Sequence, residues 1–525
     1  MKRLNAWRAC ATVFRVSVPR IANLGELLRQ LAAQHGERPA VIGEHNALSF
    51  AALDRAADAW SGLVAAYGRG AHIGLLAGNG PAWLAVAFGV WRAGATLVPI
   101  STFVTARELG EVLEHADIDL LVVQPRLRAH DLVDLLDRTE KPRRLRDIML
   151  LDSPLPPRPP GEGRGEGISG TPDPASIACI LYTSGTTGEP KGVMLSHRAI
   201  LATTLPTAER TGLTDSDALL STLPLFWVAG LVIRALPTLA TGCALILVET
   251  FTVDAVLAAL RRHRPTALHL RPPQVGQILA HPDFDPSLLA AVCKGGGRAD
   301  WYAPHLRDAR LITGYGMTEA AGYVTALHWR DPPEIRRTQI GTALPGVEIR
   351  ILDEAGRPCP PEQVGEVRVR GPGLFSGYYK QPPLVGLDAD GFFITGDLGR
   401  IDAQGIFHFV GRSKDLLRVK GINVSPMEVE AVLGTHPAVE AAYVVGLPPD
   451  GLDQQLAALI VTRQDQSVTE TELRALAAAA LSHYKRPERY VFIEPGAVPL
   501  SGTAKPQRAA LARLAVIRLR GAPIA

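Results

Sequence analysis

The sequence predicts an α/β protein with three parts. These are a large N-terminal domain of doubly wound sheets, a small β-rich subdomain, and a small α+β domain at the C-terminus. Helix-like and strand-like patterns alternate through residue 330, which is typical of a mainly parallel sheet. Short alternating strands follow from residue 347, and the pattern starts afresh near residue 411. A chain of 525 residues is long enough for about two to four domains.

The first elements follow from the spacing of apolar residues. Four leucines between residues 24 and 31 fall at helical intervals, and Gly36 ends that pattern. A second helix is predicted over residues 50–67, where apolar side chains again share one face. Short apolar runs separated by helical segments predict buried strands at residues 72–77, 120–123 and 148–151.

Residues 154–176 are rich in proline and glycine and nearly free of apolar side chains, so we expect a mobile surface loop. Alternation then returns. Strands are predicted at residues 244–248 and 267–270, with a helix at residues 253–263 between them.

The C-terminal third shows a different pattern. Short strands at residues 347–352, 366–370 and 407–410 predict the β-rich subdomain. Beyond residues 411–415, Ser425 to Glu428 read as a capping box with proline at the first helical position. Strands at residues 441–445 and 456–461 and a helix at residues 468–483 complete an α+β unit. We therefore divide the chain into an extension (1–20), a large domain (21–411) and a small domain (412–525).

Composition excludes several classes of protein. Hydrophobic residues make up 47% and charged residues 20%, and the net charge is +3, so nothing indicates a nucleic-acid partner. The five cysteines are scattered and lack CxxC spacing, which favours a reducing compartment without disulfides or structural zinc. No apolar run reaches the ~18–20 residues of a membrane span. We expect a cytoplasmic protein whose basic, acid-free first 20 residues are disordered, with a transit peptide as the alternative.

The segment from Tyr182 to Val193 is the most informative part of the chain. It reads YTSGTTGEPKGV and follows an apolar run, so a strand leads into a loop of hydroxyls and glycines with one lysine. Such a loop offers short donors and free backbone approach to a polyphosphate. Its glycine spacing differs from that of a Walker A loop, which disfavours a P-loop hydrolase.

This loop resembles the phosphate-binding signature of the adenylate-forming superfamily, which includes acyl-CoA synthetases, adenylation domains and luciferases. Further segments resemble that family's other signatures, in its order. They are Tyr315-Gly316-Met317-Thr318-Glu319, the run ITGDLG at 394–399, GRSKD at 411–415 with KGINV at 420–424, and PLSGTAK at 499–505. The resemblance covers roughly residues 20–510. It implies activation of a carboxylic acid with ATP and Mg²⁺ to an acyl-AMP, followed by transfer to CoA.

The resemblance also implies roles for individual residues. Glu319 is the expected Mg²⁺ ligand, Thr318 a donor to the α-phosphate, and Lys505 the cation that bridges carboxylate and phosphate. Lys191 is the fourth expected catalytic residue. Nucleotide- or CoA-binding residues are expected to be Thr183, Ser184, Gly185, Thr186, Thr187, Gly188, Gly295, Gly296, Gly297, Tyr315, Asp397, Arg412, Lys420 and Gly421. Lys414 is the expected hinge about which the small domain, an AMP-binding lid, rotates.

Two positions depart from the family pattern. Ala504 stands where glycine is common, and Trp227 where many members carry histidine. We expect Trp227, Val228 and Gly230 to line the acid pocket. Because no charged residue occurs among the expected pocket residues, the sequence favours an apolar fatty or aryl acid over an amino acid.

Two alternatives to a CoA ligase remain at this point. One is an acyl-AMP ligase that loads an acyl carrier protein, and the other is a nucleotide-binding homologue that has lost activity. The sequence leaves the acid, its chain length and a homodimer open.

Overall fold

The structure is a computed structural model that describes residues 21–155, 171–183, 191–296, 310–383, 385–419, 422–447, 454–500 and 506–519. The expected N-terminal extension and most of the expected loop at 154–176 lie outside these ranges. The chain forms two compact units. The first unit contains residues Met1–Val347 and Gly371–Val385, and the second contains Glu348–Arg370 and Gly386–Ala525. The α/β fold expected from the sequence is confirmed, and the boundary at residues 411/412 stays a prediction.

One large sheet of the first unit has the strand order β15-β14-β13-β11-β12-β1-β2. All neighbours are parallel except the last pair, β1 and β2. Its strands are β1 (Pro39–Ile42), β2 (Ala47–Ser49), β11 (Ala218–Ser221), β12 (Ala244–Leu247), β13 (Ala267–His269), β14 (Lys294–Gly296) and β15 (Arg310–Ile312). The carboxyl ends of β11 to β15 therefore share one edge, where ligands of open α/β sheets bind.

The other large sheet has the order β10-β9-β4-β3-β5-β8. Its strands are β3 (His72–Leu76), β4 (Thr96–Ile100), β5 (Leu120–Val123), β8 (Asp147–Leu150), β9 (Ile177–Thr183) and β10 (Lys191–Ser196). Only β10 runs antiparallel to its neighbour. The hairpin of β9 and β10 therefore forms one edge of this sheet, with β10 as the edge strand.

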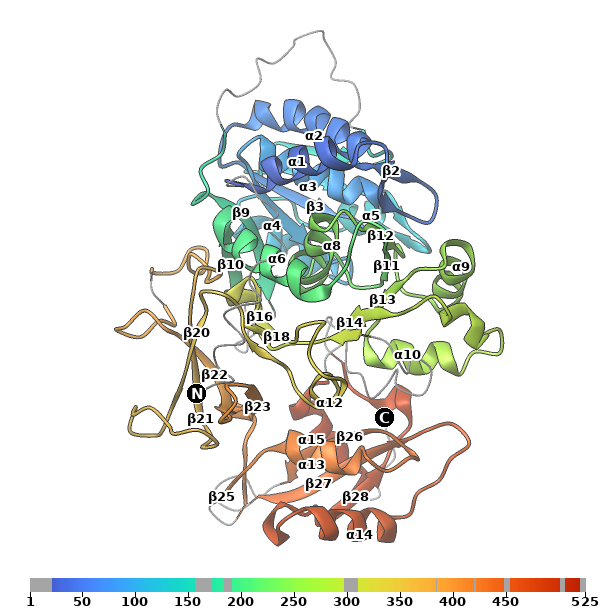
Figure 1. The fold of residues 1–525 in the computed structure, drawn as a ribbon, viewed down its shortest axis with the longest axis vertical. Helices are drawn as coiled ribbons and strands as arrows, with labels where there is room; N and C mark the ends of the chain where they lie inside the picture. The colour runs from blue at the N-terminus through green and yellow to red at the C-terminus, as the bar shows by residue number, and fades with distance from the viewer. Residues whose placement is uncertain are drawn as a thin grey trace. The chain divides into compact units, whose positions relative to one another are not determined.

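Helices cover both sheets, as the sequence predicted. Figure 1 shows α1 (Leu24–His35), α2 (Phe50–Val64) and α3 (Pro81–Arg92) packed together, and Trp60, Trp83 and Trp91 are almost fully buried in their neighbourhood. The remaining longer helices of this unit are α4 (Ala106–His115), α5 (Leu132–Asp137), α6 (His197–Thr211), α8 (Leu236–Ala240), α9 (Val253–His263), α10 (Pro272–Leu279) and α12 (Pro333–Thr338).

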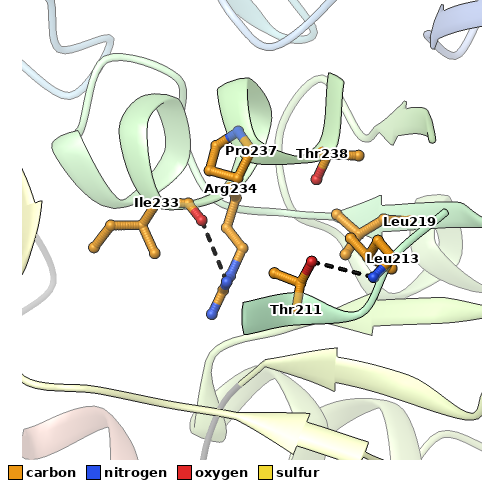
Figure 2. A pocket seen from close by; sticks show the side chains of 7 residues that line it. All are labelled: Thr211, Leu213, Leu219, Ile233, Arg234, Pro237 and Thr238. Carbon is orange, nitrogen blue, oxygen red and sulfur yellow. Dashed lines mark hydrogen bonds between the residues drawn. The ribbon is translucent and has the colours of Figure 1, made fainter. Parts of the chain in front are cut away.

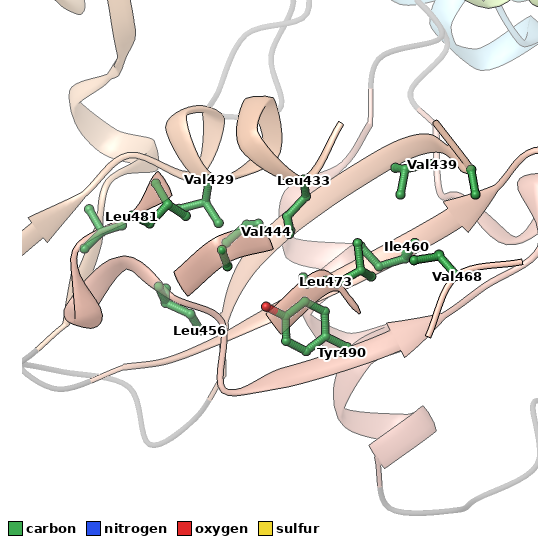
Figure 3. Close-up of a cluster of buried hydrophobic side chains, with 14 of the residues drawn as sticks. Val429, Leu433, Val439, Val444, Leu456, Ile460, Val468, Leu473, Leu481 and Tyr490 are labelled. Atoms are coloured by element: carbon green, nitrogen blue, oxygen red, sulfur yellow. The ribbon is translucent and has the colours of Figure 1, made fainter. Parts of the chain in front are cut away.

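The second unit begins with an antiparallel sheet of β20 (Glu348–Leu352), β21 (Gly365–Arg370), β22 (Phe393–Ile401) and β23 (Phe407–Arg412). The hairpin of β24 (Leu417–Val419) and β25 (Ile422–Val424) follows. A sheet of β26 (Val439–Leu447), β27 (Gln455–Thr462) and β28 (Arg489–Phe492) then packs with α13 (Pro426–Leu433), α14 (Glu470–Ala480) and α15 (Arg508–Leu519). Figure 3 shows the apolar cluster that joins α13 and α14 to these strands.

The capping box expected at Ser425 is wrong in one respect. A helix does begin at Pro426, but the Ser425 hydroxyl makes no capping bond. It donates instead to the backbone carbonyl of Val410 at 2.7 Å, a contact that sequence spacing cannot reveal. In the described part of the chain, no helix is both long and apolar enough to cross a membrane.

Candidate active site

The expected phosphate loop connects the two strands of the β9–β10 hairpin. Thr183 ends β9 and pairs in register with Lys191, the first residue of β10. Residues 184–190 between them lie outside the described ranges, but both ends of the loop are placed. The hairpin therefore fixes the positions of Thr183 and Lys191 at the end where the two strands enter the loop.

A segment from much later in the chain lies beside β10. Backbone bonds join Ser376 and Gly377 to Met194, and Tyr379 to Gly192. Tyr378 is thereby placed beside the hairpin, and the Lys191 ammonium lies 5.4 Å from the centroid of its ring. Tyr378 lies in none of the motifs found in the sequence, and only this long-range pairing brings it to the site.

Tyr378 also contacts the expected metal ligand. Its hydroxyl donates a hydrogen bond to Glu319 Oε1 at 2.9 Å. Burial, and then the charge of Glu319, raises the pKa of Tyr378, so the phenol stays protonated and acts as a donor. The structure thus brings Lys191 and Glu319, two of the expected catalytic residues, into contact with the same tyrosine, one at its ring and one at its hydroxyl.

Glu319 and Thr318 sit on a tight turn. They form a single 3₁₀ turn, Thr318–Ala320, between β16 (Gly316–Met317) and β17 (Gly322–Tyr323). A Cβ on Gly316 would lie 2.1 Å from the Gly322 carbonyl oxygen, so this crossing requires glycine. Tyr315, at the start of the segment, is 8% exposed, and its role at the adenine remains a prediction.

Residues expected for the acid pocket and residues expected for the nucleotide follow strands at the carboxyl edge of the seven-stranded sheet. Trp227 follows β11, Gly296 ends β14, and Tyr315 follows β15. Gly295 and Gly296 pair in register with Leu268 and His269 of β13. Val228 and Gly230 form the short helix α7 (Val228–Gly230) directly after Trp227.

Buried polar side chains hold the loop before Trp227. Asn79 donates to the carbonyls of Leu223 (3.0 Å) and Val248 (3.2 Å) and accepts from the Leu225 amide at 2.8 Å. A Cβ on Gly230 would lie 1.9 Å from the Pro224 carbonyl oxygen, so the turn also depends on that glycine. These contacts fix the backbone that carries Trp227.

A charged residue that the sequence analysis did not consider faces Trp227. The guanidinium carbon of Arg271 lies 5.6 Å from the centroid of the Trp227 ring. Arg271 follows β13, which is the neighbour of β11 in the sheet. No local motif marks this arginine, and only the strand order places it beside Trp227.

In the second unit, the expected ribose ligand is paired with the expected arginine. Asp397 of β22 and Arg412 of β23 are register partners, and Arg412 Nε lies 3.2 Å from Asp397 Oδ1. The Asp397 side chain is 4% exposed and that of Arg412 is 49% exposed. Lys414 follows in a 3₁₀ turn, Ser413–Asp415, and its hinge role stays a prediction.

Several expected residues cannot be placed. Ser184, Gly185, Thr186, Thr187, Gly188, Gly297, Lys420, Gly421 and Lys505 lie outside the described residues. Within the described ranges, no three His, Cys, Asp or Glu side chains form a metal-binding cluster. A single carboxylate such as Glu319 suits Mg²⁺ that is shared with substrate phosphates, because this ion usually keeps few protein ligands.

Comparison with known proteins gives a consistent result. The AMP-binding enzyme family matches residues 28–379, and the AMP-binding enzyme C-terminal domain matches residues 428–505. A sulfoacetate–CoA ligase of Cupriavidus necator is 30% identical over 505 residues, which cover 92% of this chain and 96% of that protein. A feruloyl-CoA synthase of an Amycolatopsis species is 32% identical over 475 residues, covering 87% and 92%.

A solved structure extends the likeness to three dimensions. ATP-bound MatB from Rhodopseudomonas palustris matches with a TM-score of 0.78 and 26% identity, covering 94% of this chain and 99% of that one. Both family segments, both ligases and this fold agree with the motifs found in the sequence. The chain therefore belongs to the AMP-binding enzymes of the adenylate-forming superfamily, and it is an AMP-forming acid–CoA ligase.

Proposed function

We propose that this ligase activates a carboxylic acid with a largely apolar body, using Mg²⁺–ATP, and transfers the acyl group to CoA. The observation that carries the proposal is the cluster of Lys191, Tyr378 and Glu319 beside the β9–β10 hairpin. It combines a cation with a carboxylate suited to a metal ion. Both are what a reaction at the α-phosphate requires, since catalysis there depends on positioning and charge.

The residues have distinct tasks in this proposal. Glu319 would hold Mg²⁺, which supplies charge neutralisation at the phosphates when bound. Lys191 and the hydroxyls from Thr183 onward bind phosphate oxygens, and Thr318 donates to the α-phosphate. Asp397 accepts hydrogen bonds from the ribose hydroxyls. The Lys505 ammonium contacts oxygens of both the substrate carboxylate and the α-phosphate.

An aromatic cluster supports an apolar body for the acid. The rings of Phe103, Phe226 and Trp227 pack with centroid separations of 5.7 to 6.3 Å. Phe103 is 48% exposed, so this cluster presents apolar surface to solvent near the candidate acid site. The relatives named above act on sulfoacetate and on a feruloyl group, so family membership alone does not fix the acid.

The test is direct. Purified protein with ATP, Mg²⁺, CoA and a panel of acids should release pyrophosphate and AMP and form an acyl-CoA. Release of ADP would contradict the proposal. Replacing CoA with an acyl carrier protein in the same assay tests the other acceptor, and sedimentation tests the homodimer.

Lys505→Ala separates binding from chemistry. We expect near-normal ATP binding and an adenylation rate lowered by about 10²–10³, because one preorganised electrostatic contact to the transition state is lost. Arg513→Ala is the matched control, since it removes an exposed positive charge from α15. Equal rates for the two variants would refute the role of Lys505.

A further inference from the structure

Arg271 is a cation that pairs with no acidic side chain in the described part of the chain. Its Nε is buried and makes no hydrogen bond. Its guanidinium lies over the Trp227 ring and its backbone amide donates to Gln274, but no carboxylate pairs with it among the residues that the structure describes. Burial lowers the pKa of Arg271, and no neighbouring carboxylate acts to raise it. The guanidinium therefore contacts an indole, and no described residue supplies a counter-charge.

The position of Arg271 is fixed by a buried glutamine. Gln274 is 3% exposed, and its Oε1 accepts from the Arg271 amide at 2.9 Å and from the Thr222 hydroxyl at 2.6 Å. Thr222 directly follows β11 and starts the loop to Trp227. Gln274 thus ties the backbone of the arginine to the loop that carries the tryptophan, which makes a preorganised pair.

A second unneutralised cation lies behind the same edge. Arg234 is 4% exposed and extends from the π-helical turn Leu231–Ala235 (Figure 2). It donates to His269 Nδ1 at 2.7 Å, to the Tyr323 hydroxyl at 2.9 Å and to backbone carbonyls. Burial, and then the charge of Arg234, holds the pKa of His269 well below its ordinary range, so this imidazole stays neutral.

The Arg234 guanidinium therefore makes several hydrogen bonds, but all of its acceptors are uncharged. No described carboxylate pairs with it, and the cavity beside it is about 10 Å³, room for about one water and not for a substrate. Arg234 contacts His269, which precedes Arg271 by two residues, so the charge of Arg234 lies near the same end of β13 as the arginine that faces Trp227. The carboxyl edge of β13 thus carries an excess of positive charge.

An unpaired, partly buried charge destabilises a protein unless a ligand supplies the opposite charge. We propose that Arg271 binds a second anionic group, a carboxylate or a sulfonate, on the acid substrate, remote from the carboxyl that is activated. This inference rests on the proposed function and makes the substrate class more specific: an acid with an apolar body and a distal negative charge. Trp227 packs on the apolar body and on the guanidinium, and the planar fork of Arg271 matches an oxyanion.

The experiment compares acids that differ only in the distal charge. Dicarboxylic acids from succinate to suberate, and terephthalate, are each paired with their monomethyl ester. ω-Sulfo acids of similar length separate a sulfonate from a carboxylate. Pyrophosphate release gives kcat/KM for each acid with the parent, Arg271→Met, Arg271→Lys and the control Arg262→Met, which removes an exposed charge from α9.

The parent should prefer the best diacid over its monomethyl ester by about 10- to 100-fold, the value of charge-assisted hydrogen bonds. Arg271→Met should abolish this preference by lowering kcat/KM for the diacid alone. Arg271→Lys should retain part of it, and Arg262→Met all of it. Thermal unfolding of Arg271→Met should match the parent or exceed it, because an unpaired buried charge is removed.

Three results would overturn the inference while leaving the ligase activity intact. In the first, the parent uses ester and diacid equally well. In the second, Arg271→Met leaves the diacid preference unchanged. In the third, this variant raises KM for ATP with every acid, which would assign Arg271 to the nucleotide. If Arg271→Met does not fold, the comparison of diacid and ester in the parent still decides. Failure to release pyrophosphate with any acid would instead refute the proposed function.

Discussion

Tyr378→Phe tests the proposed metal role of Glu319. The substitution removes one hydroxyl, which donates to Glu319 Oε1 at 2.9 Å, and keeps the ring beside Lys191. A hydrogen bond to a charged group contributes about 1.5–3 kcal/mol. Glu319 is only partly buried, so water replaces some of this bond and we expect a loss near the lower limit. A loss of about 1.4 kcal/mol corresponds to tenfold, at the low end of the effect that partners of metal ligands have on metal affinity.

The assay is pyrophosphate release against free Mg²⁺, at saturating ATP and acid. We expect the Mg²⁺ concentration for half-maximal rate to rise about tenfold, with a much smaller change in kcat at saturating Mg²⁺. Tyr67→Phe is the matched control, because it removes a 2.7 Å bond from a tyrosine to Asp147, away from the site. If both variants show the parent's Mg²⁺ dependence, Tyr378 does not position a metal ligand, and the assignment of Mg²⁺ to Glu319 is wrong.

The other predictions concern the second unit and the stability of the first. Asp397→Asn should raise KM for ATP about 10- to 100-fold with little change in KM for the acid, because a buried acceptor beside Arg412 becomes neutral. Lys294→Met should lower the free energy of unfolding by about 3 kcal/mol in urea titrations, since it removes the cation 2.7 Å from buried Asp217. Burial opposes ionisation of Asp217, but bonds from Lys294, Thr266 and Thr214 hold its pKa below 3.8. Its contribution is therefore complete above that value and is lost as the pH falls through the lower folded pKa, so the parent should lose its advantage over Asp217→Asn on acidification, as measured by urea denaturation at each pH.

Elements that depend on local spacing were predictable from the sequence. The helix expected over residues 50–67 is α2 followed by one 3₁₀ turn, Ala65–Tyr67, and the strands of the β-rich subdomain occur where expected. The start of α13 was also predicted, but the partner of Ser425 was not. Its hydroxyl donates to a carbonyl fifteen residues earlier and does not accept from a helix amide, because tertiary contacts bring that carbonyl close.

The residues of the candidate site also fall into two groups, those that a sequence motif identifies and those that only the fold brings to the site. Glu319 and Lys191 lie in contiguous motifs, so their residue types and neighbours in the chain identify them. Tyr378 and Arg271 lie in no such motif. One reaches the site because its segment pairs with β10, and the other because β13 is the neighbour of β11. The expectation of an uncharged acid site therefore omitted Arg271, which contacts Trp227 in space but belongs to no motif.

In the proposed function, different parts of the first unit carry the residues for the nucleotide and the residues for the acid. Lys191, Tyr378 and Glu319 are held by the β9–β10 hairpin and the turn after β16, so we expect changes there to affect the reaction with every acid. Trp227 and Arg271 extend from loops whose backbones are fixed by other residues, Asn79 and Gln274. Because the strands and these buried amides carry the backbone, the side chain at 271 can change without altering the hairpin. A change of substrate charge at that position should consequently leave the adenylation machinery intact, which is why the diacid preference and the ATP parameters of Arg271→Met are expected to respond independently.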